Sequence, residues 1–123
     1  MTTREHKVPG PDHPITVEPA GGRVVARAGS EVIADTTSAL VLREASYPPV
    51  YYLPRADVRP EVLRQSGSST YCPYKGDASY FDLVVAGQEL ADAVWTYEQP
   101  YDDVAGIAGH VAFYPDRVTV GPA

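Results

Sequence analysis

The chain has 123 residues, which at roughly 150 residues per domain predicts one compact domain and excludes two full ones. Hydrophobic residues make up 44% and charged residues 21%, an ordinary globular composition that excludes disorder, collagen-like repeats and a coiled coil. The net charge of −6 provides no basic surface of the kind that follows a phosphate backbone, so nucleic acid is not expected as a partner.

The sequence also indicates a compartment. It has no run of about 18 apolar residues, and residues 1–14 are polar without an apolar signal-like segment, so we expect neither a membrane span nor a secretory signal. The single cysteine, Cys72, has no partner for an internal disulfide, whereas small secreted domains usually contain several. These features predict a cytoplasmic protein that does not contact a membrane. We also expect it to be a monomer or homodimer.

In chain order, residues 1–14 show no periodicity and predict a flexible polar arm, with a single β-rich domain over residues 15–123. Apolar and polar residues begin to alternate at Ile15, and Gly29-Ser30 suits a type II′ hairpin turn. Residues 38–44 are apolar on both faces, which fits either a buried strand or a helical turn. The strands expected in this half cover residues 15–18, 23–27 and 31–34.

The second half predicts further strands and two short helices. Pro60 suits the first turn of a helix over residues 60–64, and Gly109 ends a second one over residues 101–108. Residues 66–70 are expected to be a loop. Within residues 89–97, alternation places Ala91, Ala93, Trp95 and Tyr97 on one face. The other strands expected here cover residues 50–53, 80–85, 110–114 and 118–120.

These elements predict a mainly β fold of eight or nine mostly antiparallel strands with two short helices. The common catalytic motifs are absent from the sequence: it has no Gly-rich phosphate loop, CxxC pair, HExxH or Gly-x-Ser-x-Gly. With one Cys and three His, a zinc site would need Asp or Glu for most of its ligands. We therefore expect neither a metal nor a cofactor.

Four segments carry a resemblance to a known family. They are YYLPRADV at residues 51–58, TYCPYKG at 70–76, AVWTYE at 93–98 and IAGHVAFY at 107–114. In this order, over residues 17–120, they resemble the domain-of-unknown-function 427 (DUF427) family, and the polar arm lies outside the resemblance. The resemblance implies a small bacterial-type protein made of a bent pair of antiparallel sheets, a β-tent, and it implies no reaction. A nucleotidyltransferase-like label is attached to this family, and no motif in the chain supports it.

The segment from Cys72 to Gly76 contains the only thiol and one of two lysines. A thiol near an ammonium group is a candidate nucleophile, and Lys75 is a candidate for binding an anionic group. The alternative is structural, because Pro73, Gly76 and a buried Cys are common in tight connections. On an extended chain an odd separation points Cys72 and Lys75 to opposite faces, so we expect Cys72 to pack inward while Tyr74 or Lys75 faces the ligand.

Further candidates lie at strand ends. Trp95 with Tyr97, followed by Glu98, forms an aromatic wall beside a carboxylate, although Trp95 also suits the centre of a core and Glu98 an exposed strand end. His110 is the one histidine beyond the arm, either a base or a side chain bound to the backbone. Arg55 is either an anion clamp or half of a local ion pair with Asp57.

Two functions of different classes remain. The first is binding of a small molecule, anionic or nucleotide-like, with or without enzymatic activity, in one shared pocket at strand ends. The second is a noncatalytic domain that binds a protein or peptide on an aromatic face. The residues predicted to line the ligand pocket are Tyr52, Arg55, Tyr74, Lys75, Trp95, Glu98 and His110.

Overall fold

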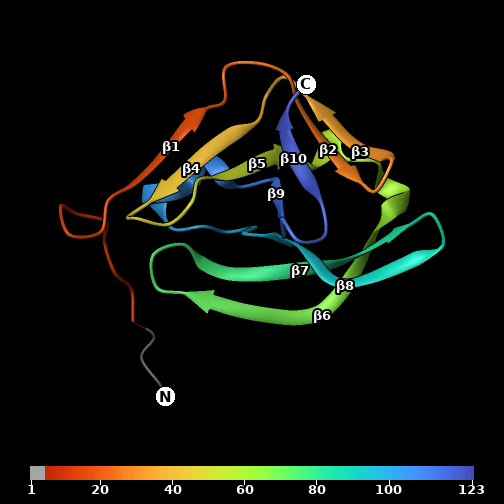
Figure 1. Cartoon of the computed structure of the whole chain (residues 1–123). Coiled ribbons are helices and arrows are strands. Elements are labelled where there is room, and N and C mark those ends of the chain that lie inside the picture. Colours follow the sequence, from red (N-terminus) through yellow and green to blue (C-terminus); the bar gives the residue numbers. More distant parts are fainter. Residues whose placement is uncertain (1–4) are drawn as a thin grey trace.

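A computed structural model describes residues 5–123, which form ten strands in two antiparallel sheets (Figure 1). The larger sheet has the order β1-β4-β5-β9-β8-β7-β6, and the smaller has the order β10-β2-β3. The mainly β, single-domain prediction is confirmed, with one or two strands more than expected. The strands are β1 (Ile15–Pro19), β2 (Val24–Ala28), β3 (Glu31–Thr36), β4 (Leu40–Glu44), β5 (Val50–Pro54), β6 (Leu63–Cys72), β7 (Gly76–Val85), β8 (Gln88–Thr96), β9 (His110–Phe113) and β10 (Thr119–Pro122).

Helical structure in residues 5–123 is limited to three short 3-10 segments, η1 (Arg55–Asp57), η2 (Pro60–Val62) and η3 (Asp102–Ile107). Two of them lie where short helices are predicted, and η2 begins with a proline as expected. None of the helices in this part of the chain is long and apolar enough to cross a membrane. Of the ambiguous residues 38–44, Leu40–Glu44 form a strand, β4, which lies between β1 and β5.

The predicted loop over residues 66–70 is wrong, because these residues belong to β6. The pairing of β6 with β7 shifts register between Gln65 and Ser69, which marks a bulge in the strand. Within it, the Ser66 and Ser68 hydroxyls donate hydrogen bonds to Asp92 on β8, at 2.5 and 2.7 Å. Serine and glycine residues that favour a loop locally are therefore held in β6 by its pairing with β7 and by the hydrogen bonds to Asp92 on β8.

The hydrophobic core has two parts, one on each face of the larger sheet. The first cluster packs this sheet against the smaller one, where Leu53, Phe81 and Val94 meet Ile33 and Val118. The inner cluster lies on the opposite face and is closed by two side chains from η3. Because neighbouring strand residues point to opposite faces, Leu53 joins the first cluster and Tyr52 the inner one. The buried members of the inner cluster are Leu42, Tyr52, Ala78, Tyr97, Val104, Ile107 and Ala112.

The larger sheet bends around the inner cluster. Between β4 and β7 lie β5, β9 and β8, so a flat sheet would hold β4 and β7 roughly 19 Å apart. Nevertheless Lys75, in the turn before β7, bonds to Glu44 at the end of β4 at 2.5 Å. In Figure 1, β6 to β8 form the lower part of the molecule and β1, β4 and β5 lie above them.

A bulge in β8 changes which face of the strand one residue occupies, compared with the prediction. The pairing of β7 with β8 shifts register between Phe81 and Leu83, and Asp92 has a positive φ of 52°. As a result, Trp95 packs against the inner cluster, whereas Ala93 packs in the first cluster. The prediction that Ala93 lies on the same face as Trp95 and Tyr97 is therefore wrong.

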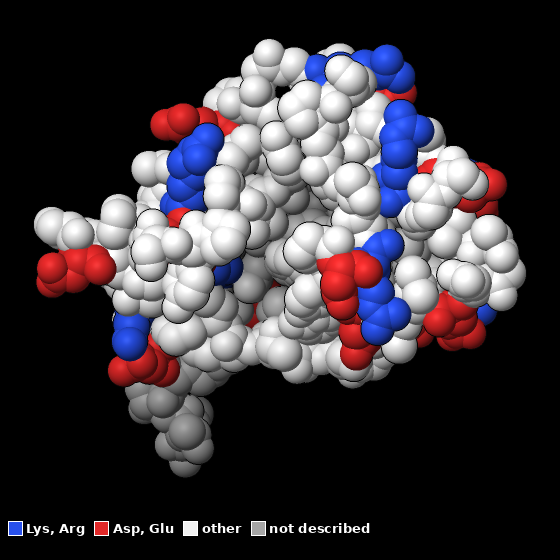
Figure 2. Space-filling view, viewed as in Figure 1, with Lys and Arg blue, Asp and Glu red and all other residues white. Residues whose placement is uncertain are grey.

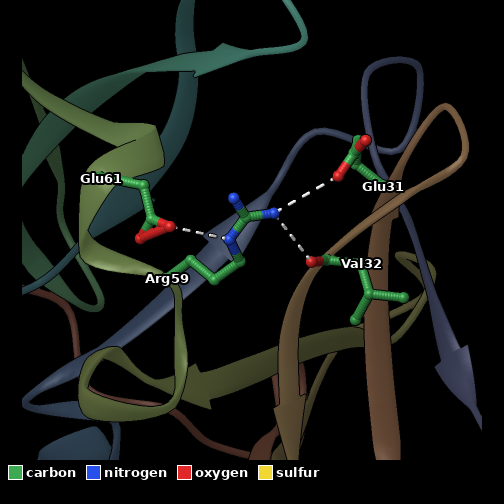
Figure 3. Close-up of polar contacts among 4 residues, drawn as sticks. All are labelled: Glu31, Val32, Arg59 and Glu61. Atoms are coloured by element: carbon green, nitrogen blue, oxygen red, sulfur yellow. Dashed lines mark hydrogen bonds and ion pairs between the residues drawn. The ribbon is translucent and has the colours of Figure 1, made fainter.

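Arg59 connects the segment before η2 to β3 (Figure 3). Its side chain bonds to Glu61 at 3.0 Å, to Glu31 at 3.5 Å and to the Val32 carbonyl at 3.4 Å. Its backbone N–H donates to the carbonyl of Ile33 at 2.8 Å. Because exposed ion pairs contribute little, the segment is joined to the smaller sheet mainly by this backbone bond, by the hydrogen bond from Thr36 to Asp57 at 2.7 Å and by the buried Val58.

We expect Gly76→Ala to destabilise the fold by about 1–3 kcal/mol, because Gly76 has φ +112°, a conformation nearly restricted to glycine. An added Cβ would also lie 3.4 Å from the carbonyl oxygen of Gln99. The matched control is Gly22→Ala, at a glycine without a positive φ and with open space around it. Urea unfolding of both variants measures the effect, and equal losses would contradict this role of Gly76.

Candidate functional site

An ion-pair cluster lies beside the inner cluster. Lys75 Nζ donates to Glu44 Oε1 at 2.5 Å, and the other Glu44 oxygen contacts His13 Nε2 at 2.8 Å. The side chains of Lys75 and Glu44 are only 11% and 15% exposed. Burial alone would raise the pKa of Glu44, but the hydrogen bonds from Lys75 and His13 outweigh it and hold this pKa below its usual value. Glu44 is therefore a carboxylate at neutral pH, and it neutralises the buried ammonium.

The chain reverses between Cys72 and Gly76. The Lys75 N–H donates to the Cys72 carbonyl at 3.2 Å, and Cys72 pairs with Gly76 across the hairpin. The extended conformation assumed for this segment is therefore wrong, since Pro73 opens a turn. Cys72 packs against the inner cluster, is partly buried and forms no disulfide.

Part of the N-terminal arm lies along this turn. The Lys7 N–H donates to the Pro73 carbonyl at 2.9 Å. The His13 ring stacks on Tyr74, with ring centroids 4.0 Å apart, and the His6 ring stacks on Tyr101 at 3.7 Å. These contacts place the arm over the side of the hairpin that carries Tyr74.

An aromatic groove lies next to the ion-pair cluster. At its floor, the Trp95 indole N–H donates to the hydroxyl of buried Tyr52 at 3.1 Å, and the Tyr114 ring lies 4.6 Å from Trp95 at an angle of 53°. Figure 2 shows a hollow on this face, largely uncharged inside, with charged side chains around it. The groove has a volume of about 440 Å³. It is lined by Tyr47, Pro48, Pro49, Val50, Tyr51, Trp95, Phe113, Tyr114, Pro115, Val118 and Val120.

A polar cavity of about 550 Å³ adjoins the groove, and the two share Tyr114. Its hydroxyl groups are linked, because the Tyr80 hydroxyl lies 2.9 Å from Thr70 Oγ1 and also hydrogen-bonds to Tyr114. The hydrogen bonds from Ser66 and Ser68 lower the pKa of Asp92. The cavity is lined by Ser68, Ser69, Thr70, Tyr80, Ala91, Asp92, Ala93, Tyr114, Asp116 and Arg117.

The tyrosines around the groove stay protonated at neutral pH. Burial is the main cause that raises the pKa of Tyr52 to about 12. For Tyr114, burial, the hydrogen bond with Tyr80 and the charges of Asp92 and Asp116 raise the pKa to about 12. The Tyr114 hydroxyl, which lines the groove, can therefore donate a hydrogen bond to a ligand, and neither tyrosine supplies a phenolate nucleophile.

A comparison of the sequence with models of known protein families identifies the family of this chain. Residues 16–121 match the model described as Domain of unknown function (DUF427). The chain belongs to this family. The name of the DUF427 model carries a nucleotidyltransferase label, which assigns a role to no residue of this chain. The comparison with curated proteins finds no match.

In this DUF427 domain the predicted pocket residues fall into separate groups. Trp95 lines the groove, and Tyr52 lies behind it. Tyr74 and Lys75 belong to the hairpin turn, where they contact the arm and Glu44. The remaining three have other surroundings: the Arg55 guanidinium lies over the Phe81 ring at 4.6 Å, Glu98 is exposed just beyond β8, and His110 Nδ1 is 2.9 Å from the Ala108 carbonyl oxygen.

Sequence reasoning missed several residues of this region. Tyr47 and Tyr114 stand in a recognisable pattern, because each exposed tyrosine is followed directly by proline. Glu44 and Asp92 carry no comparable local signal, since their partners are 31 and 24 or 26 residues away in the chain. Among residues 5–123 no three His, Cys, Asp or Glu side chains lie close enough together to hold a metal ion.

We expect Glu44→Gln to destabilise the DUF427 domain by about 3 kcal/mol, because it leaves the buried ammonium of Lys75 without a counter-charge. The matched control is Glu89→Gln, which breaks the pair between Glu89 and Arg64, whose side chains are both more than half exposed. Its cost should stay below about 1 kcal/mol. Urea unfolding at pH 7 compares the two, and similar losses would contradict the role of Glu44.

The same variant has a defined pH dependence. Because pairing holds the folded pKa of Glu44 below its usual value near 4.5, the carboxylate stabilises the fold fully above that pH and less as pH falls through the lowered pKa. The stability difference between the parent chain and Glu44→Gln should therefore be level from about pH 7 to about pH 5 and decrease in stronger acid. A difference that grows toward acid would contradict this account.

Proposed function

We propose that this DUF427 domain binds a small molecule noncovalently in the aromatic groove, with an apolar ring of the ligand against Trp95 and Tyr114. The observation that carries the proposal is the way Trp95 is held. Its only polar group is already bonded to the buried Tyr52, while its ring lies partly exposed at the groove floor. The ring is thus fixed in place without a ligand and offers an apolar face to one.

The size and lining of the groove support this function. A volume of about 440 Å³ lies within the usual range for ligand pockets, about 300–1,000 Å³. Its wall contains Pro48, Pro49 and Pro115, whose restricted backbones lose little freedom when a ligand binds. The hydroxyl-rich cavity beyond Tyr114 gives the polar part of a ligand its hydrogen-bond partners.

The proposal differs from an anion-binding or catalytic site at Lys75. The ammonium group of Lys75 is bonded to Glu44 and nearly buried, so its charge is already compensated. In this proposal the Glu44–Lys75 pair maintains the structure around the site, and the ligand binds in the groove. A small molecule as partner and the cytoplasm as compartment remain part of the proposal.

The test uses Trp95 as the reporter, because it is the single tryptophan in the chain. Ring-containing metabolites are screened by thermal shift, and each hit is titrated against Trp95 fluorescence. We expect hits that change the emission and bind at least about fivefold more weakly to Tyr47→Ser, which loses one aromatic contact. Val32→Ser, on an exposed residue outside the groove, is the control. Hits that leave the emission and the Tyr47→Ser affinity unchanged would place the site elsewhere.

A further inference from the structure

The charges around Tyr114 are predominantly negative. Asp92, Asp116 and Arg117 are the charged residues of the polar cavity, which gives it a formal charge of −1, and the aromatic groove is lined by uncharged residues. Arg117 Nε lies 3.7 Å from an Asp116 oxygen, so the one cation is associated with one of the two carboxylates. The other carboxylate, Asp92, has no cation among its bonded partners.

Asp92 is held in one position with its charge retained. Its two oxygens accept hydrogen bonds from Ser66 and Ser68, and its backbone N–H donates to Asp82 at 2.9 Å. The positive φ of 52° at Asp92 is uncommon for a residue with a side chain, and the bulge in β8 maintains it. The negative charge therefore has a fixed place beside Tyr114.

The aromatic rings add an attraction for positive charge. The faces of Trp95 and Tyr114 are electron-rich, and the two rings lie against each other, tilted by 53° with their centroids 4.6 Å apart. Asp92 and Asp116 line the cavity that shares Tyr114 with the groove, and the charges of both contribute to the raised pKa of the Tyr114 hydroxyl. A positive group that lies in the groove against these two rings would be attracted both by the ring faces and by the carboxylates of the adjoining cavity.

We propose that the ligand of this groove is an organic cation, a substituted ammonium group that lies over Trp95 and Tyr114 and faces Asp92 and Asp116, with its apolar body in the groove. This inference rests on the proposed function and adds the sign of the ligand's charge. An anionic or nucleotide-like ligand, as the sequence led us to expect, would place its charge against two carboxylates.

Three probes with one ring and different charges test the inference: benzyltrimethylammonium, benzyl alcohol and phenylacetate. Each is titrated to about 10 mM against the intact chain at low salt, with Trp95 fluorescence and calorimetry as readouts. We expect the cation to bind about five- to thirtyfold more tightly than the alcohol and phenylacetate to bind most weakly. The preference for the cation should decrease as salt is raised.

Two substitutions distinguish the contribution of the carboxylate charge to binding from that of the aromatic ring. Asp116→Asn, at a side chain that is 76% exposed, should weaken only the cation, by about two- to fivefold. Tyr114→Leu keeps an apolar side chain and should remove most of the preference for the cation. Glu18→Gln, which changes the net charge equally on exposed β1, is the control and should have no effect.

The possible results distinguish this inference from the proposed function. Equal binding of all three probes, with a change in Trp95 emission, would overturn the cation assignment and leave the groove as a binding site. Tighter binding of phenylacetate would also overturn the assignment. The absence of both a fluorescence change and heat for every probe would contradict the groove as a binding site.

Discussion

The bond between Glu44 and Lys75 is the constraint on which the rest of the structure depends. It joins the end of β4 to the turn before β7, although three strands lie between them in the sheet. The bond is possible only because the sheet bends, and the bend encloses the inner cluster. With both side chains nearly buried, breaking the bond would cost more than an exposed ion pair contributes, so it favours the bent sheet over a flatter one.

The same bond positions one wall of the groove. The loop that carries Tyr47, Pro48 and Pro49 begins directly after Glu44, so the place of β4's last residue determines where the loop starts. Tyr47 is also 6.5 Å from His13, ring to ring, and His13 contacts Glu44. The opposite side of the groove comes from β10 of the smaller sheet. The ion pair and the groove are therefore neighbouring parts of one arrangement, of which the first is nearly buried and the second opens at the surface.

The sequence predicts what depends on local pattern and misses what depends on distant contacts. Alternating residues identify the strands, and a proline at its start identifies η2. The strand over residues 66–70 is not predicted, because its Ser and Gly residues favour loops, and its pairing with β7 and the hydrogen bonds to Asp92 on β8 are contacts with later parts of the chain. In the same way, Trp95 is noticed as a rare aromatic residue, but its partner Tyr52 is 43 residues away. Single residues of the site are thus predictable, whereas their grouping needs the bend of the sheet.

A double-mutant cycle tests the role of the ion pair most directly. Glu44→Gln, Lys75→Met and the double variant are unfolded in urea at pH 7, and the coupling free energy is calculated from the four stabilities. The account predicts that the double variant is more stable than Glu44→Gln alone, with a coupling of about 1–3 kcal/mol, because the second change removes the unpaired buried ammonium. Additive losses, with the double variant least stable of all, would show that the two side chains do not hold the bent sheet together.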